Sequence, residues 1–350
     1  MNNKFLQFIH NFRGLAIVLI VSVHCRTSLH WPNDSILNKF LTHFLDSSTI
    51  LFVFIAGFLF QHLNANSFRF NDYILKKATY VILPYVLISI PALVDKLFFE
   101  TDAYWMSPFY KNLSIPFQAV YLLATGKHSG PFYFIPMIAV IYCMAPLLFR
   151  FQKSKFFTWV GGLIALLGLF TYAYGYYGNI GESLLYFLPV YIFGMWASYH
   201  KEKLLIINNW ILVSLTLFYF IVLYLEVSHV IHPQHLNFFE ERPHYFTTIF
   251  NLSKLKEMTL AIILLIVFYR IKEQKIEWLT LLGNYSFGIY FTHIYFINAT
   301  ERIMDYLNLS RLQNGIVYLV FTASIIGISV ATVWVIKKIF KDRSRLVIGS

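Results

Sequence analysis

Two side chains in the first apolar stretch of the chain, Arg13 and His24, can do chemistry inside a membrane. Ten residues, almost all apolar, separate them. In a helix this step is a rise of about 16 Å and returns to within about 20° of the starting direction, so both side chains share one face. We predict His24 as a general base, because an imidazole can accept a hydroxyl proton near neutral pH and a cationic neighbour would hold it neutral. Arg13 is predicted as the second catalytic residue. The alternative for the pair alone is a snorkelling arginine and a structural histidine.

A second group of polar residues lies late in the chain and consists of Ser286, Tyr290 and His293. Their spacing places the three side chains on one face of a helix. We expect them to orient His24 or to line a pocket for the acceptor of a transferred group. The alternative is that they hydrogen-bond neighbouring helices and only hold the bundle together.

Basic residues cluster before the third apolar stretch, at Arg69, Lys76 and Lys77. Because a lysine ammonium acts as a point charge for phosphate, we predict that Lys76 and Lys77 bind the phosphates of an anionic donor together with Arg13. Coenzyme A is made in the cytoplasm and carries several phosphates, so its acyl thioester suits such a cluster. Anionic lipid head groups are the alternative ligand.

Membrane-spanning helices must position these residues. Hydrophobic residues make up 58% of the chain and charged residues 13%, whereas soluble domains carry about 25% charged residues. The predicted fold is all-α, a polytopic transmembrane bundle with about ten spanning helices. Residues 1–340 are expected to form one integral-membrane domain and residues 341–350 a short basic cytoplasmic tail. The expected spans are 12–30, 47–64, 79–99, 131–150, 156–175, 183–199, 208–227, 248–270, 279–299 and 314–336.

The basic residues also predict the topology. If the N-terminus is cytoplasmic, 18 of the 28 Lys and Arg residues fall on the inner side of these spans. The positive-inside rule then favours an arrangement with both termini inside. The net charge is +11, but the basic residues lie between the membrane segments and do not form one patch. We therefore expect membrane lipids and no nucleic acid as partners. The stretch 113–125 is too short to span and is predicted to be interfacial or re-entrant.

Histidines gather in the longest predicted outer loop, residues 228–247. A metal site there is conceivable, but two prolines argue against one helix presenting the ligands. Interfacial aromatic and polar residues explain the loop better, and no metal is predicted. The histidines concerned are His229, His232, His235 and His244.

Six segments, taken in order, resemble the integral-membrane family-3 acyltransferases, which O-acylate bacterial surface glycans and related molecules. The first is RGLAIVLIVSVH, which carries the Arg–(ten residues)–His signature. The others depart from the family pattern in places: Ala56 replaces a serine, Lys76 and Lys77 replace paired arginines, Tyr80 stands where a third arginine is expected, and Tyr133 replaces a tryptophan. These segments are LFVFIAGFLF at 51–60, YILKKATYVILPY at 73–85, GPFYFIPMIAVIYCMAPLL at 130–148, FLPVYIFGMW at 187–196 and LLGNYSFGIYFTH at 281–293.

The resemblance implies a membrane O-acyltransferase in the bacterial inner membrane. It would move an acyl group, expected to be acetyl, from cytoplasmic acyl-CoA to a hydroxyl of a lipid-linked or surface glycan. Acyl-CoA would be a co-substrate, with no bound cofactor. Tyr133 would join the group around Ser286 on the acceptor side. The alternatives are a secondary transporter or glycan exporter, with His24 and His293 as a proton relay, and an inactive relative.

Overall fold

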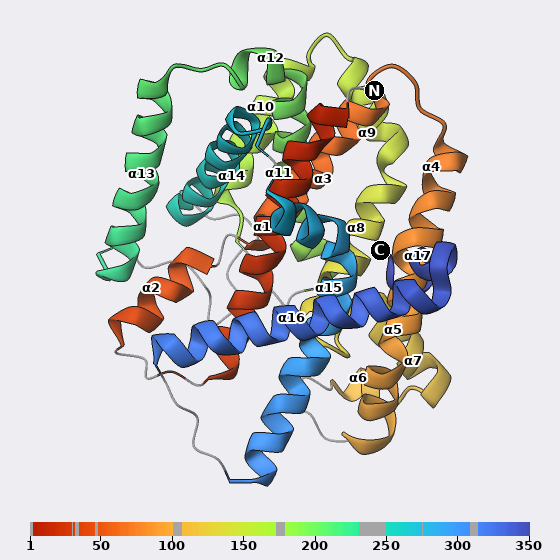
Figure 1. Cartoon of the computed structure of the whole chain (residues 1–350). Coiled ribbons are helices and arrows are strands. Elements are labelled where there is room, and N and C mark those ends of the chain that lie inside the picture. Colours follow the sequence, from red (N-terminus) through yellow and green to blue (C-terminus); the bar gives the residue numbers. More distant parts are fainter. Residues whose placement is uncertain are drawn as a thin grey trace.

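The computed structural model describes residues 3–29, 31, 35–45, 48–100, 107–172, 179–230, 250–274, 276–308 and 314–350. Within these ranges the chain is helical and contains no strand, which confirms the all-α prediction (Figure 1). Most of the predicted histidine-rich loop lies outside the described residues, because they omit 231–249.

The helices follow one another with short connections. The first half contains α1 (Asn3–Ser28), α2 (Ile36–Leu45), α3 (Ser48–Asn64), α4 (Phe70–Lys77), η1 (Ala78–Ile82), α5 (Leu83–Val94), η2 (Asp95–Phe99), α6 (Pro108–Lys111), α7 (Ile115–Thr125), η3 (Gly130–Tyr133), α8 (Phe134–Cys143) and α9 (Ala145–Lys153). The second half contains α10 (Phe157–Leu167), η4 (Gly168–Phe170), α11 (Ile180–Tyr199), α12 (Lys201–Leu204), α13 (Asn209–Val227), α14 (Leu252–Arg270), α15 (Glu277–Tyr306), α16 (Gly315–Phe340), η6 (Lys341–Arg343) and α17 (Ser344–Ile348).

The chain is a membrane protein, but its number of spans is not confirmed as ten. Among the described residues six helical stretches are long and apolar enough to cross a membrane, or seven if the bent pair α8–α9 counts as one span. Each predicted span coincides with a helix, yet several fall short for physical reasons. The α8–α9 pair bends by 54°, and α10 has only 11 residues. The first two turns of α14 carry Lys254, Lys256 and Glu257. The inner position of both termini stays a prediction.

The helix that carries Arg13 and His24 packs along α15 in the same direction. Gln7 donates to Thr280 near the start of both helices, and Ser28 donates to Glu301 near their other end. The backbones cross closely at Gly14 and Gly283. A Cβ on Gly14 would lie 2.2 Å from the Leu279 carbonyl oxygen, and a Cβ on Gly283 would lie 2.1 Å from that of His10. Only glycine permits this approach, as in close helix crossings in membranes.

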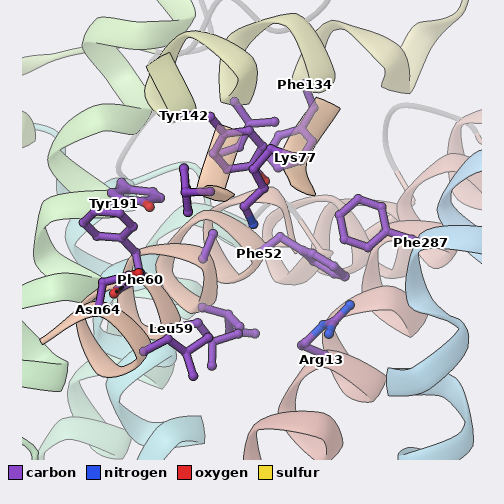
Figure 2. Close-up of a pocket in the computed structure, with 15 residues that line it drawn as sticks. Arg13, Phe52, Leu59, Phe60, Asn64, Lys77, Phe134, Tyr142, Tyr191 and Phe287 are labelled. Atoms are coloured by element: carbon purple, nitrogen blue, oxygen red, sulfur yellow. Dashed lines mark hydrogen bonds between the residues drawn. The ribbon is translucent and has the colours of Figure 1, made fainter. Parts of the chain in front are cut away.

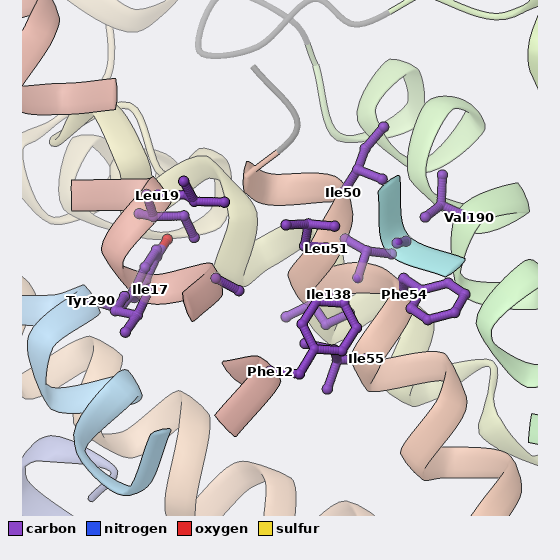
Figure 3. Packing of buried hydrophobic residues seen from close by; sticks show 14 of the residues in the cluster. Phe12, Ile17, Leu19, Ile50, Leu51, Phe54, Ile55, Ile138, Val190 and Tyr290 are labelled. Carbon is purple, nitrogen blue, oxygen red and sulfur yellow. The ribbon is translucent and has the colours of Figure 1, made fainter. Parts of the chain in front are cut away.

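A second close pair, α3 and α11, forms the centre of the apolar core. A Cβ on Gly57 would lie 2.0 Å from the Tyr191 carbonyl oxygen, and one on Gly194 would lie 2.2 Å from that of Phe54. Around this crossing the side chains of α1, α3, α8 and α11 interdigitate, with Phe12, Phe54 and Ile138 buried (Figure 3). The first glycine crossing therefore holds together the helices of Arg13, His24, Ser286 and His293, and the second holds the apolar core beside them.

The C-terminal helices close one side of the bundle. At one end of α16, Tyr318 donates to the Ser22 carbonyl, and at the other Lys337 lies 4.7 Å from the centroid of the Tyr285 ring. Tyr318 and Lys337 are about 28 Å apart along α16. The residues that they contact, Ser22 on α1 and Tyr285 on α15, differ much less in their position along those two helices. The α16 helix is therefore steeply tilted relative to α1 and α15. Figure 1 shows it running across α1 and ending at α17 beside α5. The predicted basic tail is thus packed: Ser344, Ile348 and Ser350 are buried.

Candidate active site

A cavity of about 180 Å³ opens between α1, α3, α4, α8, α11 and α15 (Figure 2). Most of its wall is aliphatic and aromatic, and two cations, Arg13 and Lys77, enter it from different helices. The lining contains no acidic residue. Its residues are Arg13, Phe52, Ile55, Ala56, Leu59, Phe60, Leu63, Asn64, Tyr73, Lys77, Phe134, Ile138, Tyr142, Tyr191 and Phe287.

Arg13 is held by α15 rather than by a carboxylate. One of its terminal nitrogens donates to the Ser286 hydroxyl at 2.7 Å, and its guanidinium lies 5.9 Å from the centroid of the Phe287 ring. No salt bridge to Arg13 occurs within the described part of the chain. Ser286 is fully buried and neutral, so it orients the guanidinium without neutralising it. The charge is left available to an anion in the cavity.

Lys77 is surrounded by rings instead of acceptors. Its ammonium lies 4.5 Å from the centroid of the Tyr142 ring and 5.3 Å from that of Tyr73. No carboxylate pairs with it in the ranges that the structure describes. The neighbouring Lys76 points away: it is exposed and does not line the cavity. The structure therefore brings Arg13 and Lys77 together and leaves Lys76 outside.

His24 and His293 form a pair of rings further along the same two helices. Their ring centroids are 5.3 Å apart. His293 is fully buried, and its Nδ1 lies 3.0 Å from the Ile289 carbonyl oxygen. A neutral ring must donate to a carbonyl, so Nδ1 carries the proton and Nε2 is an acceptor. That Nε2 has no hydrogen-bond partner among the described residues. It is a free lone pair beside His24, which itself is partly buried.

Tyr290 lies between the cavity and the histidine pair. Its ring centroid is 6.0 Å from that of Phe134, which lines the cavity, and 6.1 Å from that of His293. Its hydroxyl donates to the Pro131 carbonyl at 2.5 Å. Tyr133 is partly buried and its hydroxyl lies beside Thr49. The predicted face of Ser286, Tyr290 and His293 is therefore divided along α15: Ser286 faces Arg13, Tyr290 forms a partition, and His293 faces His24.

Three buried or partly buried tyrosines in the cavity, Tyr73, Tyr142 and Tyr191, were missed by reasoning from the sequence. One signal was available for Tyr73, since it precedes Lys77 by four positions and so shares its helix face. Tyr142 and Tyr191 come from α8 and α11, and nothing local in the sequence brings them to Lys77. The rings of Tyr73 and Tyr142 make the cation–π contacts that hold the ammonium, and Tyr191 lines the cavity beside them.

The fold and the site define an all-helical membrane protein with unpaired cations and an imidazole pair enclosed between its helices. The family model described as an acyltransferase domain matches residues 6–335, nearly the whole chain, and the chain belongs to the family-3 acyltransferases. No curated protein and no solved structure matches it. The resemblance inferred from the six segments is confirmed, and the family supports the prediction of an acyltransferase.

Proposed function

We propose that this acyltransferase moves an acyl group, expected to be acetyl, from acyl-CoA to a hydroxyl of a lipid-linked or surface glycan. One observation carries the proposal: Arg13 and Lys77 line one cavity, no carboxylate pairs with either in the described residues, and Arg13 shares its helix with His24. Unpaired cations in an apolar bundle are costly unless an anion compensates them. The phosphates of coenzyme A are anions of the right kind.

The pantetheine arm of the donor would connect the cavity with the histidine pair. Arg13 and His24 are separated by a rise of about 16 Å along α1, which a pantetheine chain can cover. Tyr290 stands on this route, so its ring would wall the arm or turn aside to admit it. The phosphates would stay remote from the reacting thioester and contribute mainly to donor binding.

His24 would act as the general base at the thioester. The acceptor hydroxyl gives its proton to a ring nitrogen of His24 while its oxygen attacks the thioester carbonyl carbon. The carbon–sulfur bond then breaks, and the thiolate of coenzyme A leaves and takes up a proton. The Nε2 lone pair of His293 can accept a hydrogen bond from the His24 ring or from the acceptor, which would fix the orientation of the base.

Donor and acceptor are expected to reach His24 from opposite sides of a bacterial inner membrane. The distribution of basic residues predicts that the cavity end of α1 lies on the cytoplasmic side, where acyl-CoA is available. The outer loops predicted to meet sugar rings, around Trp105, His232 and Tyr245, lie outside the described residues. Sealed vesicles of known orientation test this arrangement, with acyl-CoA on one side and a non-permeant acceptor on the other. Product formed only when both substrates are on the cytoplasmic side would contradict it.

The proposed reaction is tested with purified protein in detergent, acetyl-CoA and a panel of glycan acceptors. We expect coenzyme A thiol to be released and acetylated acceptor to form, and we expect neither with His24→Gln. The variant should still bind coenzyme A, since His24 does not line the cavity. Wild-type protein that neither binds nor consumes acetyl-CoA would refute the choice of donor.

A further inference from the structure

The segment after α16 folds back onto the bundle beside the cavity. The chain turns at Lys341, whose φ of 48° is unusual for a residue with a side chain. Beyond it, the Ser350 hydroxyl accepts a hydrogen bond from the Gly288 N–H at 2.9 Å, and Ser344 donates to the Ser350 carbonyl at 3.0 Å. Gly288 directly follows Phe287, which lines the cavity. Residues 344–350 are therefore anchored to α15 at the level of Arg13.

This anchoring presents Arg345 next to η1, which directly follows α4. The Arg345 guanidinium lies 4.5 Å from the centroid of the Tyr80 ring. Tyr80 is three positions after Lys77, so the two side chains lie one helical turn apart on the same face. Arg345 is exposed, and no carboxylate pairs with it in the described ranges. A stacked, solvent-accessible guanidinium thus stands beside the helix that delivers Lys77 to the cavity.

Arg13 lies within electrostatic range of both Lys77 and Arg345. No acidic residue pairs with any of the three cations among the described residues. Arg13 and Lys77 are partly buried, and their charges are costly there unless an anion compensates them. The exposed Arg345 adds a third positive charge on the same side of the bundle. A single phosphate can be met by Arg13 and Lys77 inside the cavity. The position of Arg345 outside the lining suits a second phosphate on the same ligand.

We propose that Arg345 binds a phosphate at the nucleotide end of the acyl donor, outside the cavity that holds Arg13 and Lys77. This inference rests on the proposed function. A guanidinium pre-oriented by stacking on Tyr80 can give two parallel hydrogen bonds to a phosphate. It also brings an arginine from the C-terminal segment to the position where Tyr80 replaces the third arginine of the basic motif. An anionic lipid head group offers the same phosphate chemistry, and the experiment separates the two sources.

The test compares Arg345→Gln with Arg343→Gln, which removes another exposed arginine two positions earlier. KM and kcat are measured with acetyl-CoA and with acetyl-dephospho-CoA, which lacks the ribose phosphate, in detergent and in vesicles of zwitterionic or anionic lipid. We expect Arg345→Gln to raise the KM for acetyl-CoA about tenfold, with kcat within about twofold of wild type. With the dephospho substrate the variant should match wild type, and Arg343→Gln should match wild type with both.

Three outcomes would overturn the inference in distinguishable ways. Equal KM values for Arg345→Gln and Arg343→Gln would remove Arg345 from the site while leaving the proposed function intact. A loss with Arg345→Gln that is equal for both donors and appears only in anionic vesicles would assign the contact to lipid. Wild-type protein that does not use acetyl-CoA would refute the proposed function itself. Because Arg345 is exposed, the variant is expected to fold, and Arg345→Lys, which keeps the charge, should recover part of the affinity.

Discussion

Lys254 and Lys77 are both lysines inside the helix bundle, but their ammonium groups have different surroundings. Lys254 is fully buried and donates to the carbonyls of Gly168 and Tyr186 and to the Thr171 hydroxyl, at 2.8, 2.7 and 2.8 Å. All three of its donors are used. The Lys77 ammonium lies over the rings of Tyr73 and Tyr142, has no hydrogen bond or ion pair within the described ranges, and lines the cavity.

The second lysine of α14 repeats the contrast. Lys256 pairs with the buried Glu226 and also donates to the His43 carbonyl at 2.8 Å. The Lys256 ammonium therefore links α14 to α13 and to α2 and is not available to a ligand. Arg13, in the other region, has a neutral hydroxyl and a ring as neighbours. Burial of a cation alone therefore does not indicate a binding site, and we base the proposed donor site on cations whose donors remain unused at a cavity.

The largest effect on activity is expected from His24, which lies in neither of the two regions compared. His24→Ala should lower kcat by about 10²–10⁴-fold, because a positioned base contributes that much to proton transfer. Donor binding should persist, since the cations of the cavity are untouched. His62→Ala, which removes a partly buried histidine of α3, serves as the control. Activity of His24→Ala within about threefold of wild type would exclude His24 as the base.

Breaking the ion pair of α14 should reduce stability rather than donor affinity. Lys256→Met leaves Glu226 buried without its partner, which costs about 3–5 kcal/mol. We expect a lower midpoint of thermal unfolding in detergent and an unchanged KM of the protein that remains folded. Lys77→Met is the counterpart and should show the reverse pattern. If both variants lose stability equally, the distinction between the two regions is wrong.

A methyl group at the α1–α15 crossing should disturb the site without touching any polar residue. Gly14→Ala places a Cβ against the Leu279 carbonyl, and overpacking of this kind costs about 1–3 kcal/mol. Separation of the helices should also weaken the Arg13–Ser286 contact and lower kcat. Gly327→Ala is the matched control, because no heavy atom lies within 4 Å of its Cβ. Equal unfolding midpoints for the two variants would show that the close crossing is not needed.

Helical periodicity was sufficient to predict part of this arrangement. It placed Arg13 and His24 on one face of α1, and Ser286 and His293 on one face of α15. These side chains contact one another, Arg13 with Ser286 and His24 with His293. It did not reveal that the two faces meet each other, since pairing between helices far apart in sequence depends on the glycine crossing and not on local pattern. Hydropathy also did not show that Lys254 and Lys256 of α14 are buried and bind groups on neighbouring helices.

The choice between adjacent lysines shows the same limit. Lys76 and Lys77 are equivalent in composition and charge, so the sequence assigned both to the donor. Their separation comes from about 100° of helix rotation, which turns Lys77 towards Tyr142 and leaves Lys76 exposed. Tyr142 and Tyr191 belong to helices that no local motif links to α4. The sequence therefore predicted the cation Lys77 but not the tyrosines that surround it in the cavity.

This pair of lysines gives the most direct test of the claim that the cavity holds the donor. Calorimetric titration of coenzyme A into purified wild type, Lys77→Gln and Lys76→Gln in the same detergent measures donor affinity without catalysis. We predict that Lys77→Gln raises the Kd about tenfold, as expected for one charge-assisted contact, and that Lys76→Gln stays within about twofold of wild type. Equal affinities for the two variants, or a larger loss with Lys76→Gln, would contradict it.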